Sequence, residues 1–302
     1  EKNRDVGGRM YTRHTELGGF DVGTQYFTAD SERFQKAIAH WRKAGWVSTW
    51  SGRLVTVDNG SSKEAGRSKQ RFVGIPGMGT LLENLAQGVD IRTEQLVTRF
   101  ERYDDQWLLG VQADTVPVEA SAGPFDAVVV AAPAARALPL LQSAPQLARQ
   151  AKQASAQPCW ALTLGFQDSL DLGYDGGWVK GSRLAWIARD TSKPQRRPGE
   201  HWVGHASHEW SIEHLEDDPE RVKEKLLRAF HQATGSQVQP VYAGVVRWLY
   251  AQPIDPLPEA YLWDSKLRIG ACGDWFSAGL EGGGRVENAY LSAMALAEGV
   301  AE

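Results

Sequence analysis

The sequence predicts an α/β protein of two domains, one of which has the features of a dinucleotide-binding unit. Residues 125–133 form an unbroken apolar run, which is typical of a parallel strand buried on both faces. Residues 267–274 form a second such strand, ending in Gly273-Asp274 ahead of a C-terminal helix. An acidic residue and a glycine pair open the chain. At 302 residues, the chain is long enough for two domains.

The first ten residues combine acidic, basic and glycine positions. Glu1 is followed by Arg4, the pair Gly7-Gly8, and Arg9. In a dinucleotide-binding unit, a carboxylate after the second strand accepts hydrogen bonds from ribose hydroxyls. Glycines let backbone amides approach a pyrophosphate, and an arginine adds charge-assisted donors. Taken alone, so short a pattern also fits a charged N-terminal segment with a Gly-Gly turn.

Composition excludes several classes of function. The net charge of −4 gives no electrostatic basis for binding nucleic acid. Cys159 and Cys272 lie far apart, show no metal-ligand spacing and fit a reducing cytoplasm. The longest apolar stretch, residues 127–141, is interrupted by two prolines and an arginine and is too short to span a bilayer. We therefore expect a cytoplasmic protein without nucleic-acid, membrane or metal partners, and its oligomeric state is left open.

In the first half of the chain, periodicity and turn residues define the elements. A helix is predicted over residues 30–44, because Phe34, Ile38 and Trp41 recur at helical spacing and Asp30 or Ser31 can cap it. The other expected elements are a strand over 46–57, a polar surface loop over 58–69, a strand over 71–75 and a helix over 80–86 capped by Thr80. A three-strand meander is expected over 90–103, 107–113 and 116–120, with turns at Asp104-Asp105 and Asp114.

In the second half, one amphipathic helix stands out. Residues 219–234 place Val222, Leu226, Leu227 and Phe230 on one face. The remaining expected elements are a helical region over 134–154 interrupted by Pro139, a strand over 159–166, a flexible Gly-rich segment over 173–181, strands over 202–210 and 241–250, and a helix over 290–301. Twelve tryptophans indicate that several of them line a cavity or a domain interface.

The motif at residues 1–9 resembles the one that follows the second strand in flavin amine oxidases. Two further segments, Phe20–Thr28 and Leu184–Pro194, are similar to the bacterial renalase-like branch of that superfamily. The resemblance covers nearly the whole chain. Such proteins begin with a strand, a Gly-x-Gly-x-x-Gly turn and a helix, and the sequence has no Gly-x-Gly-x-x-Gly. We therefore expect a chain that is truncated at its N-terminus and binds its cofactor poorly.

The resemblance implies a Rossmann-type FAD-binding domain and an α+β substrate domain with an antiparallel sheet. The FAD domain would comprise residues 1–27, 75–150 and 262–302, and the substrate domain residues 28–74 and 151–261. A shared FAD domain requires the strand within 125–133 to lie beside the strand within 267–273.

The implied cofactor is non-covalent FAD, and the implied reaction oxidises a dihydropyridine, a reduced nicotinamide dinucleotide isomer. Hydride would pass to the flavin, and oxygen would be reduced to hydrogen peroxide. Two alternatives stay open. One is a flavin amine oxidase or desaturase with another substrate, and the other is an inactive fragment that does not bind FAD.

Carried over position by position, the resemblance implies a set of cofactor-binding residues. Asp274 would contact the ribityl-phosphate arm, the start of the last helix would support the flavin ring, and the Val97 backbone would reach the adenine. Asn288 stands where a glycine is common, and an ordinary meander with Val97 in its core remains open. The full set is Glu1, Arg4, Gly8, Arg9, Gln25, Val97, Ala132, Gly273, Asp274, Arg285, Val286, Glu287 and Ala289.

Candidates for the substrate pocket are mostly aromatic, because flat apolar walls suit a planar substrate on a flavin. They are Tyr26, Phe27, Trp186, His205 and Trp275. On one predicted strand, His205 and His208 would point to opposite faces and form no metal pair. A satisfied strand histidine is the alternative for His205. No catalytic acid or base is assigned, because the flavin carries the chemistry of hydride transfer.

Overall fold

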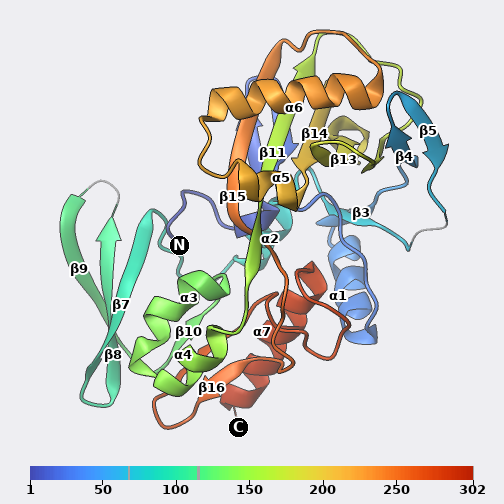
Figure 1. Ribbon diagram of the computed structural model, residues 1–302. Coiled ribbons are helices and arrows are strands. Elements are labelled where there is room, and N and C mark those ends of the chain that lie inside the picture. The colour runs from blue at the N-terminus through green and yellow to red at the C-terminus, as the bar shows by residue number, and fades with distance from the viewer. Residues whose placement is uncertain (67–68, 114–115, 302) are drawn as a thin grey trace.

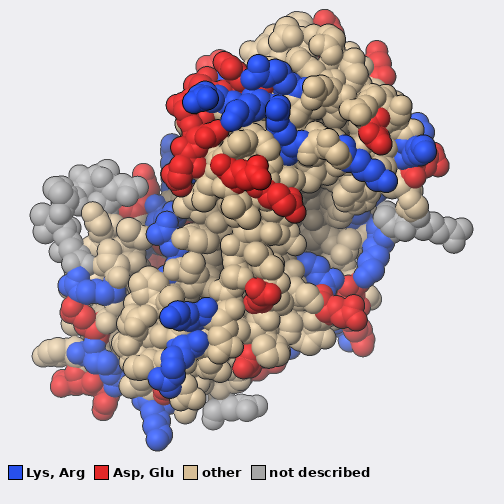
Figure 2. Space-filling view, in the orientation of Figure 1, with Lys and Arg blue, Asp and Glu red and all other residues tan. Residues whose placement is uncertain are grey.

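The computed structural model describes residues 1–66, 69–113 and 116–301. The chain has a mixed α/β fold with two main lobes, and a three-stranded sheet stands at the side of the lower one (Figure 1). Acidic and basic side chains are intermixed over the face shown in Figure 2, and the surface is hollowed between the lobes. Within the described residues, no helix is both long and apolar enough to cross a membrane.

The upper lobe is built on a seven-stranded sheet in the order β15-β11-β14-β13-β12-β4-β5. All neighbours are antiparallel except the parallel pair β12 and β4. The strands are β15 (Tyr242–Pro253), β11 (Ala156–Phe166), β14 (Glu200–Ala206), β13 (Leu184–Arg189), β12 (Gly176–Val179), β4 (Leu54–Asp58) and β5 (Ser61–Glu64).

Helix α6 (Pro219–Thr234) covers one face of this sheet, as Figure 1 shows. Its predicted bounds are confirmed, because both ends carry local signals. The Asp218 side chain accepts hydrogen bonds from the backbone N–H groups of Glu220 and Arg221, and Gly235 ends the helix in the left-handed region. The predicted apolar face is buried against Leu162, Leu164 and other residues of the sheet.

The lower lobe contains a three-stranded sheet of β10 (Val128–Val130), β17 (Ile269–Ala271) and β16 (Leu262–Asp264). The expected parallel pairing is present, with Val128 opposite Ile269. The expectation that β10 is buried on both faces is wrong, because Val129 is 47% exposed. Helices α3 (Ala134–Leu140), α4 (Pro145–Ala151) and α7 (Val286–Ala301) surround this sheet, with a 3-10 turn at Leu141–Ser143.

The remaining strands form smaller sheets. The meander consists of β7 (Gln95–Tyr103), β8 (Gln106–Ala113) and β9 (Val116–Phe125), and the expected turn at Asp114 lies outside the described residues. The other elements are the hairpin β1 (Thr12–Thr15) and β2 (Gly18–Asp21), the pair β3 (Val47–Thr49) and β6 (Phe72–Gly74), and helices α1 (Glu32–Lys43), α2 (Thr80–Leu85) and α5 (His208–Glu213). The Ser31 side chain caps α1 as expected.

Several predicted elements are corrected by long-range pairing. The strand expected over 46–57 is two strands in different sheets, because β3 pairs with β6 and β4 pairs with β12. The loop expected over 58–69 contains β5, which forms a hairpin with β4 through Asn59-Gly60, a turn pair with positive φ at both residues. The segment 173–181 contains β12, where a Cβ on Gly177 would lie 2.4 Å from the Val55 carbonyl oxygen. Gly177 therefore allows β12 and β4 to pack closely.

Two helix boundaries also differ from the prediction. The strand expected over 202–210 ends at Ala206, because Ser207 caps α5 and accepts a hydrogen bond from Trp210 N. His208 is therefore the first residue of a helix. Thr80 is not a cap, since it already lies within α2 behind Gly79.

Candidate functional site

The segment Asp21–Gln25 begins where β2 ends and passes close to the N-terminal loop. Thr24 N donates a hydrogen bond to Arg9 O over 2.9 Å. A Cβ on Gly23 would lie 2.0 Å from the same oxygen, so only glycine fits this approach. Two stretches named by the resemblance, residues 1–9 and 20–28, are therefore side by side.

Arg9 and Asp274 form a bidentate ion pair that joins this loop to the end of a parallel strand. Arg9 Nη1 and Nη2 lie 2.7 and 2.6 Å from the two oxygens of Asp274, and Arg9 Nη1 also donates to Ala251 O. Asp274 lies three residues beyond β17, on the carboxyl-end side where open α/β sheets bind ligands. The structure thus brings together two of the predicted cofactor residues.

The N-terminal residues run beside the start of the meander. Glu1 O accepts a hydrogen bond from Gln95 N, at the start of the strand that carries Val97. The Glu1 carboxylate accepts from Asn3 N over 2.7 Å, and both Glu1 and Arg4 are exposed. Val97 is half-buried and pairs with Val111 on β8.

The side chains at the start of α7 are engaged with α1. The Glu287 carboxylate is fully buried and accepts hydrogen bonds from Asp30 N, Ser31 N and Ser31 Oγ. Arg285 pairs with Asp30 over 2.7 Å. These two predicted cofactor residues therefore use their side chains to hold one helix against another.

Three other predicted cofactor positions also have partners within the protein. Ala289 N bonds to Arg285 O, and Gly273 N bonds to Ser292 Oγ. The Ala132 carbonyl accepts from Trp275 Nε1 over 3.1 Å. Val286 packs against the buried cluster that contains Phe27 and Trp50.

Two of the predicted aromatic residues, Tyr26 and Trp186, pack with Trp50 in a set of three rings, the aromatic wall. The Tyr26 ring centroid lies 5.9 Å from that of Trp50 and 5.7 Å from that of Trp186. The Arg71 guanidinium lies 5.4 Å from the Trp50 ring and 6.0 Å from the Tyr26 ring. Burial raises the pKa of Tyr26, and Arg71 opposes this rise. Sequence reasoning missed Trp50 and Arg71.

The other aromatic candidates occupy different surroundings. Phe27 is buried in the same cluster as Trp50 and Trp186. Trp275 packs in a different cluster, under β10 and β17, with its ring centroid 4.0 Å from that of Phe276. It is a core residue of the lower lobe.

His205 is a hydrogen-bond donor to the Asp21–Gln25 segment. Its Nε2 lies 3.2 Å from Val22 O, and a carbonyl oxygen only accepts, so Nε2 carries the proton. Trp248 Nε1 donates to the same oxygen. Burial lowers the pKa of His205 to about 4, so the ring is neutral near pH 7. His208 bonds instead to Pro158 O and Gln252.

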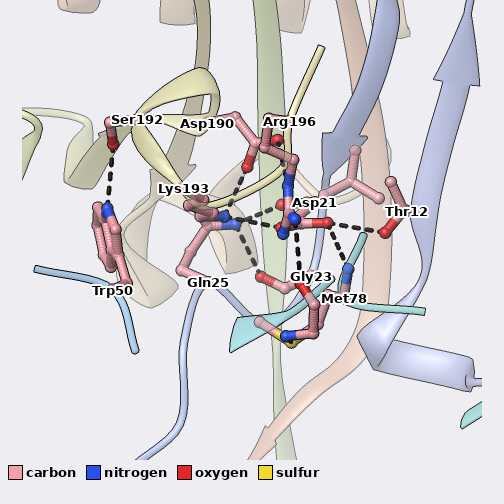
Figure 3. A network of polar contacts seen from close by, with 12 residues as sticks. Thr12, Asp21, Gly23, Gln25, Trp50, Met78, Asp190, Ser192, Lys193 and Arg196 are labelled. Carbon is pink, nitrogen blue, oxygen red and sulfur yellow. Dashed lines mark hydrogen bonds and ion pairs between the residues drawn. The ribbon is translucent and has the colours of Figure 1, made fainter. Parts of the chain in front are cut away.

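Asp21, at the start of the same segment, belongs to a charge cluster with Asp190, Lys193 and Arg196, which sequence reasoning also missed (Figure 3). Lys193 Nζ lies 2.9 Å from Asp21 Oδ2 and 2.5 Å from Asp190 Oδ1. Burial alone would raise the pKa of Asp21, but Lys193 and Arg196 outweigh it and hold that pKa well below its usual value. Burial and the nearby Asp21 carboxylate raise the pKa of Asp190.

Comparison with known proteins identifies the family. Residues 59–301 match the family of flavin-containing amine oxidoreductases. The chain belongs to this family. Because that family uses FAD, the protein is an FAD-dependent oxidoreductase.

Solved structures share the fold of this flavin oxidoreductase. A protein described as a protoporphyrinogen oxidase of Exiguobacterium sp. 255-15 is similar at a TM-score of 0.73 and 12% identity, over 99% of this chain and 91% of that one. Cyclohexylamine oxidase of Brevibacterium oxydans IH-35A is similar at 0.70 and 13% identity, over 100% and 93%. Wild-type putrescine oxidase bound to putrescine is similar at 0.65 and 11% identity, over 100% and 93%.

The residues of this flavoenzyme fit an FAD in one specific respect. Gln25 is 6% exposed, and its Nε2 donates to the carbonyls of Asp21 and Gly23. Its Oε1 is buried without a hydrogen-bond partner among the described residues. Buried acceptors in proteins normally have a hydrogen-bond partner, and a donor group on bound FAD would supply one for Gln25 Oε1. Over the same part of the chain, no cluster of His, Cys, Asp or Glu could hold a metal ion.

The low pKa of His205 predicts a pH-dependent stability. The unfolded chain takes up a proton near the ordinary value of 6.5, whereas the folded flavoenzyme does so only near 4. The contribution of His205 is therefore complete above pH 6.5 and is lost as the pH falls toward 4. In His205→Gln the amide still donates to Val22 O. We expect this variant to lose about 2 kcal/mol less unfolding free energy between pH 7 and 4.5 than the unsubstituted protein loses.

Urea unfolding at the two pH values measures this difference. His14→Gln is the control, because His14 is exposed on β1. Equal losses in both variants and the unsubstituted protein would contradict the assignment of a neutral His205.

Proposed function

We propose that this flavoenzyme oxidises a dihydropyridine, a reduced isomer of a nicotinamide dinucleotide. One observation carries the proposal. The two segments that resemble the renalase-like branch, Phe20–Thr28 and Leu184–Pro194, lie far apart in the sequence. They meet at the aromatic wall, where Tyr26 and Trp186 are 5.7 Å apart. A flat aromatic wall suits a nicotinamide-type ring stacked on a flavin.

The charges at this wall favour a dinucleotide over an amine. The Arg71 guanidinium lies over the rings of Tyr26 and Trp50. Lys193 Nζ lies 5.9 Å from the centroid of the same Trp50 ring. Cations thus already occupy the positions where aromatic faces attract a substrate ammonium. The Arg71 guanidinium would repel a protonated amine and attract the phosphates of a dinucleotide, whereas the charge of Lys193 is offset by Asp21 and Asp190.

The proposed reaction needs no catalytic base. When a dihydropyridine gives up hydride it becomes an aromatic pyridinium, and no proton has to leave a carbon atom. Bound FAD supplies the hydride acceptor and then passes the electrons to oxygen, giving hydrogen peroxide. The ionisable groups nearby have other tasks, since His205 donates to Val22 O and the Asp21 carboxylate is bound by Lys193 and Arg196.

The proposal includes a Rossmann-type FAD domain of residues 1–27, 75–150 and 262–302, with 28–74 and 151–261 forming the substrate domain. The parallel pair β10 and β17 and the Arg9–Asp274 ion pair support the first part. The membership of β4 and β5 in the seven-stranded sheet supports the second.

Amine oxidation is the second candidate, because two of the similar structures are oxidases of cyclohexylamine and putrescine. Anaerobic mixing separates the two. We expect a mixture of dihydronicotinamide dinucleotide isomers to bleach the flavin absorbance of the FAD-loaded protein, and cyclohexylamine or putrescine to leave it unchanged.

Admitting air should then restore the absorbance and release one hydrogen peroxide per flavin. The 1,4-dihydronicotinamide dinucleotide, tested alone, is the control that shows whether the enzyme distinguishes between isomers of the reduced ring. Bleaching by an amine and not by the isomer mixture would transfer the assignment to amine oxidation.

A further inference from the structure

The buried charge cluster joins two parts of the chain that are distant in sequence, the end of β2 and the segment 190–196. Asp21 ends β2, Asp190 lies in a 3-10 turn (Asp190–Ser192), and Lys193 and Arg196 follow this turn. The Asp21 carboxylate also accepts hydrogen bonds from Thr12 Oγ1 over 2.7 Å and Met78 N over 3.0 Å. The side chains of Asp21, Asp190 and Lys193 are fully buried. Burying these charges is costly because burial strips them of water, and their ion pairs and hydrogen bonds offset this cost.

The two cations of the cluster are held differently. Arg196 Nη1 donates to the backbone carbonyls of Gly74 and Pro194, over 3.0 and 3.2 Å, and also to Pro76. Arg196 therefore keeps partners without Asp21. The Lys193 ammonium group, by contrast, makes both of its hydrogen bonds within the described residues to carboxylates, one on Asp21 and one on Asp190. Lys193 and Arg196 thus both join Asp21 to the loop between β13 and β14, and Lys193 is the cation whose side chain bonds to carboxylates alone in the described part of the chain.

A chain of contacts leads from Lys193 to the orphaned acceptor of Gln25. The Asp21 side chain is fixed by Lys193, and the Asp21 backbone carbonyl accepts from Gln25 Nε2. Because the amide nitrogen faces the carbonyls of Asp21 and Gly23, the amide oxygen must point the opposite way. Figure 3 shows Gln25, Asp21 and Lys193 within one network. In the described part of the chain, Oε1 meets no donor there.

We propose that Lys193 is a positioning residue for the flavin: shared by Asp21 and Asp190, it holds the Asp21–Gln25 segment so that Gln25 Oε1 is presented to the cofactor. This inference concerns FAD binding, and it does not depend on which substrate is oxidised. Lys193 itself touches neither the cofactor nor the reacting atoms. It acts through the Asp21 carboxylate and the Gln25 amide.

The test separates positioning from the neutralisation of buried charge. Lys193→Met leaves two carboxyl groups facing Arg196 alone, and K193M/D190N removes one group of each sign. We expect K193M to lower the melting temperature of the apoprotein and the double variant to regain most of that loss. FAD affinity should fall about tenfold or more in both, and amide hydrogen exchange over residues 19–27 of the apoprotein should accelerate in both.

Two further variants complete the design. Lys225→Met is the matched control, because Lys225 bonds to a carboxylate, that of Asp217, on the outside of the upper lobe. It should leave FAD affinity and the 19–27 exchange unchanged. Gln25→Met should weaken FAD binding by itself. Adding it to K193M/D190N should cause no further loss, since both act through the same atom.

Recovery of FAD affinity and of exchange protection in K193M/D190N would overturn the proposal, because Lys193 would then only balance charge. Additive losses from Gln25→Met and K193M/D190N would overturn the route through Gln25. If K193M does not fold, the double variant and Gln25→Met still decide the question.

Discussion

Replacing Asp274 with alanine is expected to weaken FAD binding at least about tenfold and to lower the free energy of unfolding by roughly 2–3 kcal/mol. The first effect follows from the position of Asp274 beyond the end of β17, where the resemblance places the ribityl-phosphate arm. The second follows from the partly buried Arg9, which would lose both hydrogen bonds to the carboxylate. Fluorescence titration with FAD and urea unfolding measure the two effects.

Two controls separate these effects. Glu64→Ala removes an exposed partner of Arg53 and should change neither quantity. The double variant Arg9→Met/Asp274→Ala should recover part of the stability, because no unpaired guanidinium remains, while FAD binding stays weak. Unchanged FAD affinity in Asp274→Ala would remove Asp274 from the cofactor site.

Replacing Glu287 with alanine is expected to destabilise the protein by about 3 kcal/mol, which corresponds to a fall of roughly 6–10 °C in melting temperature. The carboxylate is fully buried and satisfies the backbone N–H groups of Asp30 and Ser31 as well as the Ser31 hydroxyl. Its loss leaves buried donors without an acceptor at the start of α1.

Glu298→Ala is the matched control for this substitution. Glu298 lies on the same helix and pairs with Arg33 on α1, but the two side chains are 61% and 40% exposed. Its loss should therefore cost less than about 1 kcal/mol. Differential scanning calorimetry compares the two variants, and equal shifts would show that the buried carboxylate has no special role in holding α1.

Elements with strong local signals were predictable from the sequence. Helix α6 was predicted with its observed bounds from its apolar spacing, and the structure adds that Asp218 caps it and Gly235 ends it. The Asn59-Gly60 turn is a local signal for the β4–β5 hairpin, but residues 58–69 have the character of a loop, because β5 is entirely exposed and has no apolar alternation.

The choice of pairing strand was not predictable in the same way. Residues 46–57 look like one apolar strand, yet β3 pairs with β6 and β4 pairs with β12, more than a hundred residues away in the sequence. Local propensity carries no information about which distant strand supplies the hydrogen bonds. The buried cluster of Lys193 escaped detection for the same reason, since charged residues are mostly exposed and its partner Asp21 is 172 positions away.

By itself, the sequence predicted the flavin amine oxidase family and its FAD, through the resemblance of residues 1–9, 20–28 and 184–194 and the pair Gly273-Asp274, and the family match over residues 59–301 bears this out. Motif positions determine these because a dinucleotide is held largely by backbone and by a few charged side chains at set spacings. Only the tertiary structure decided what each of these side chains touches. Glu287 accepts hydrogen bonds from the two residues that precede α1, His205 is a neutral donor to Val22, and Lys193 is bound between two carboxylates. The physical reason is that burial, protonation and hydrogen-bond partners depend on groups that folding brings from distant parts of the chain.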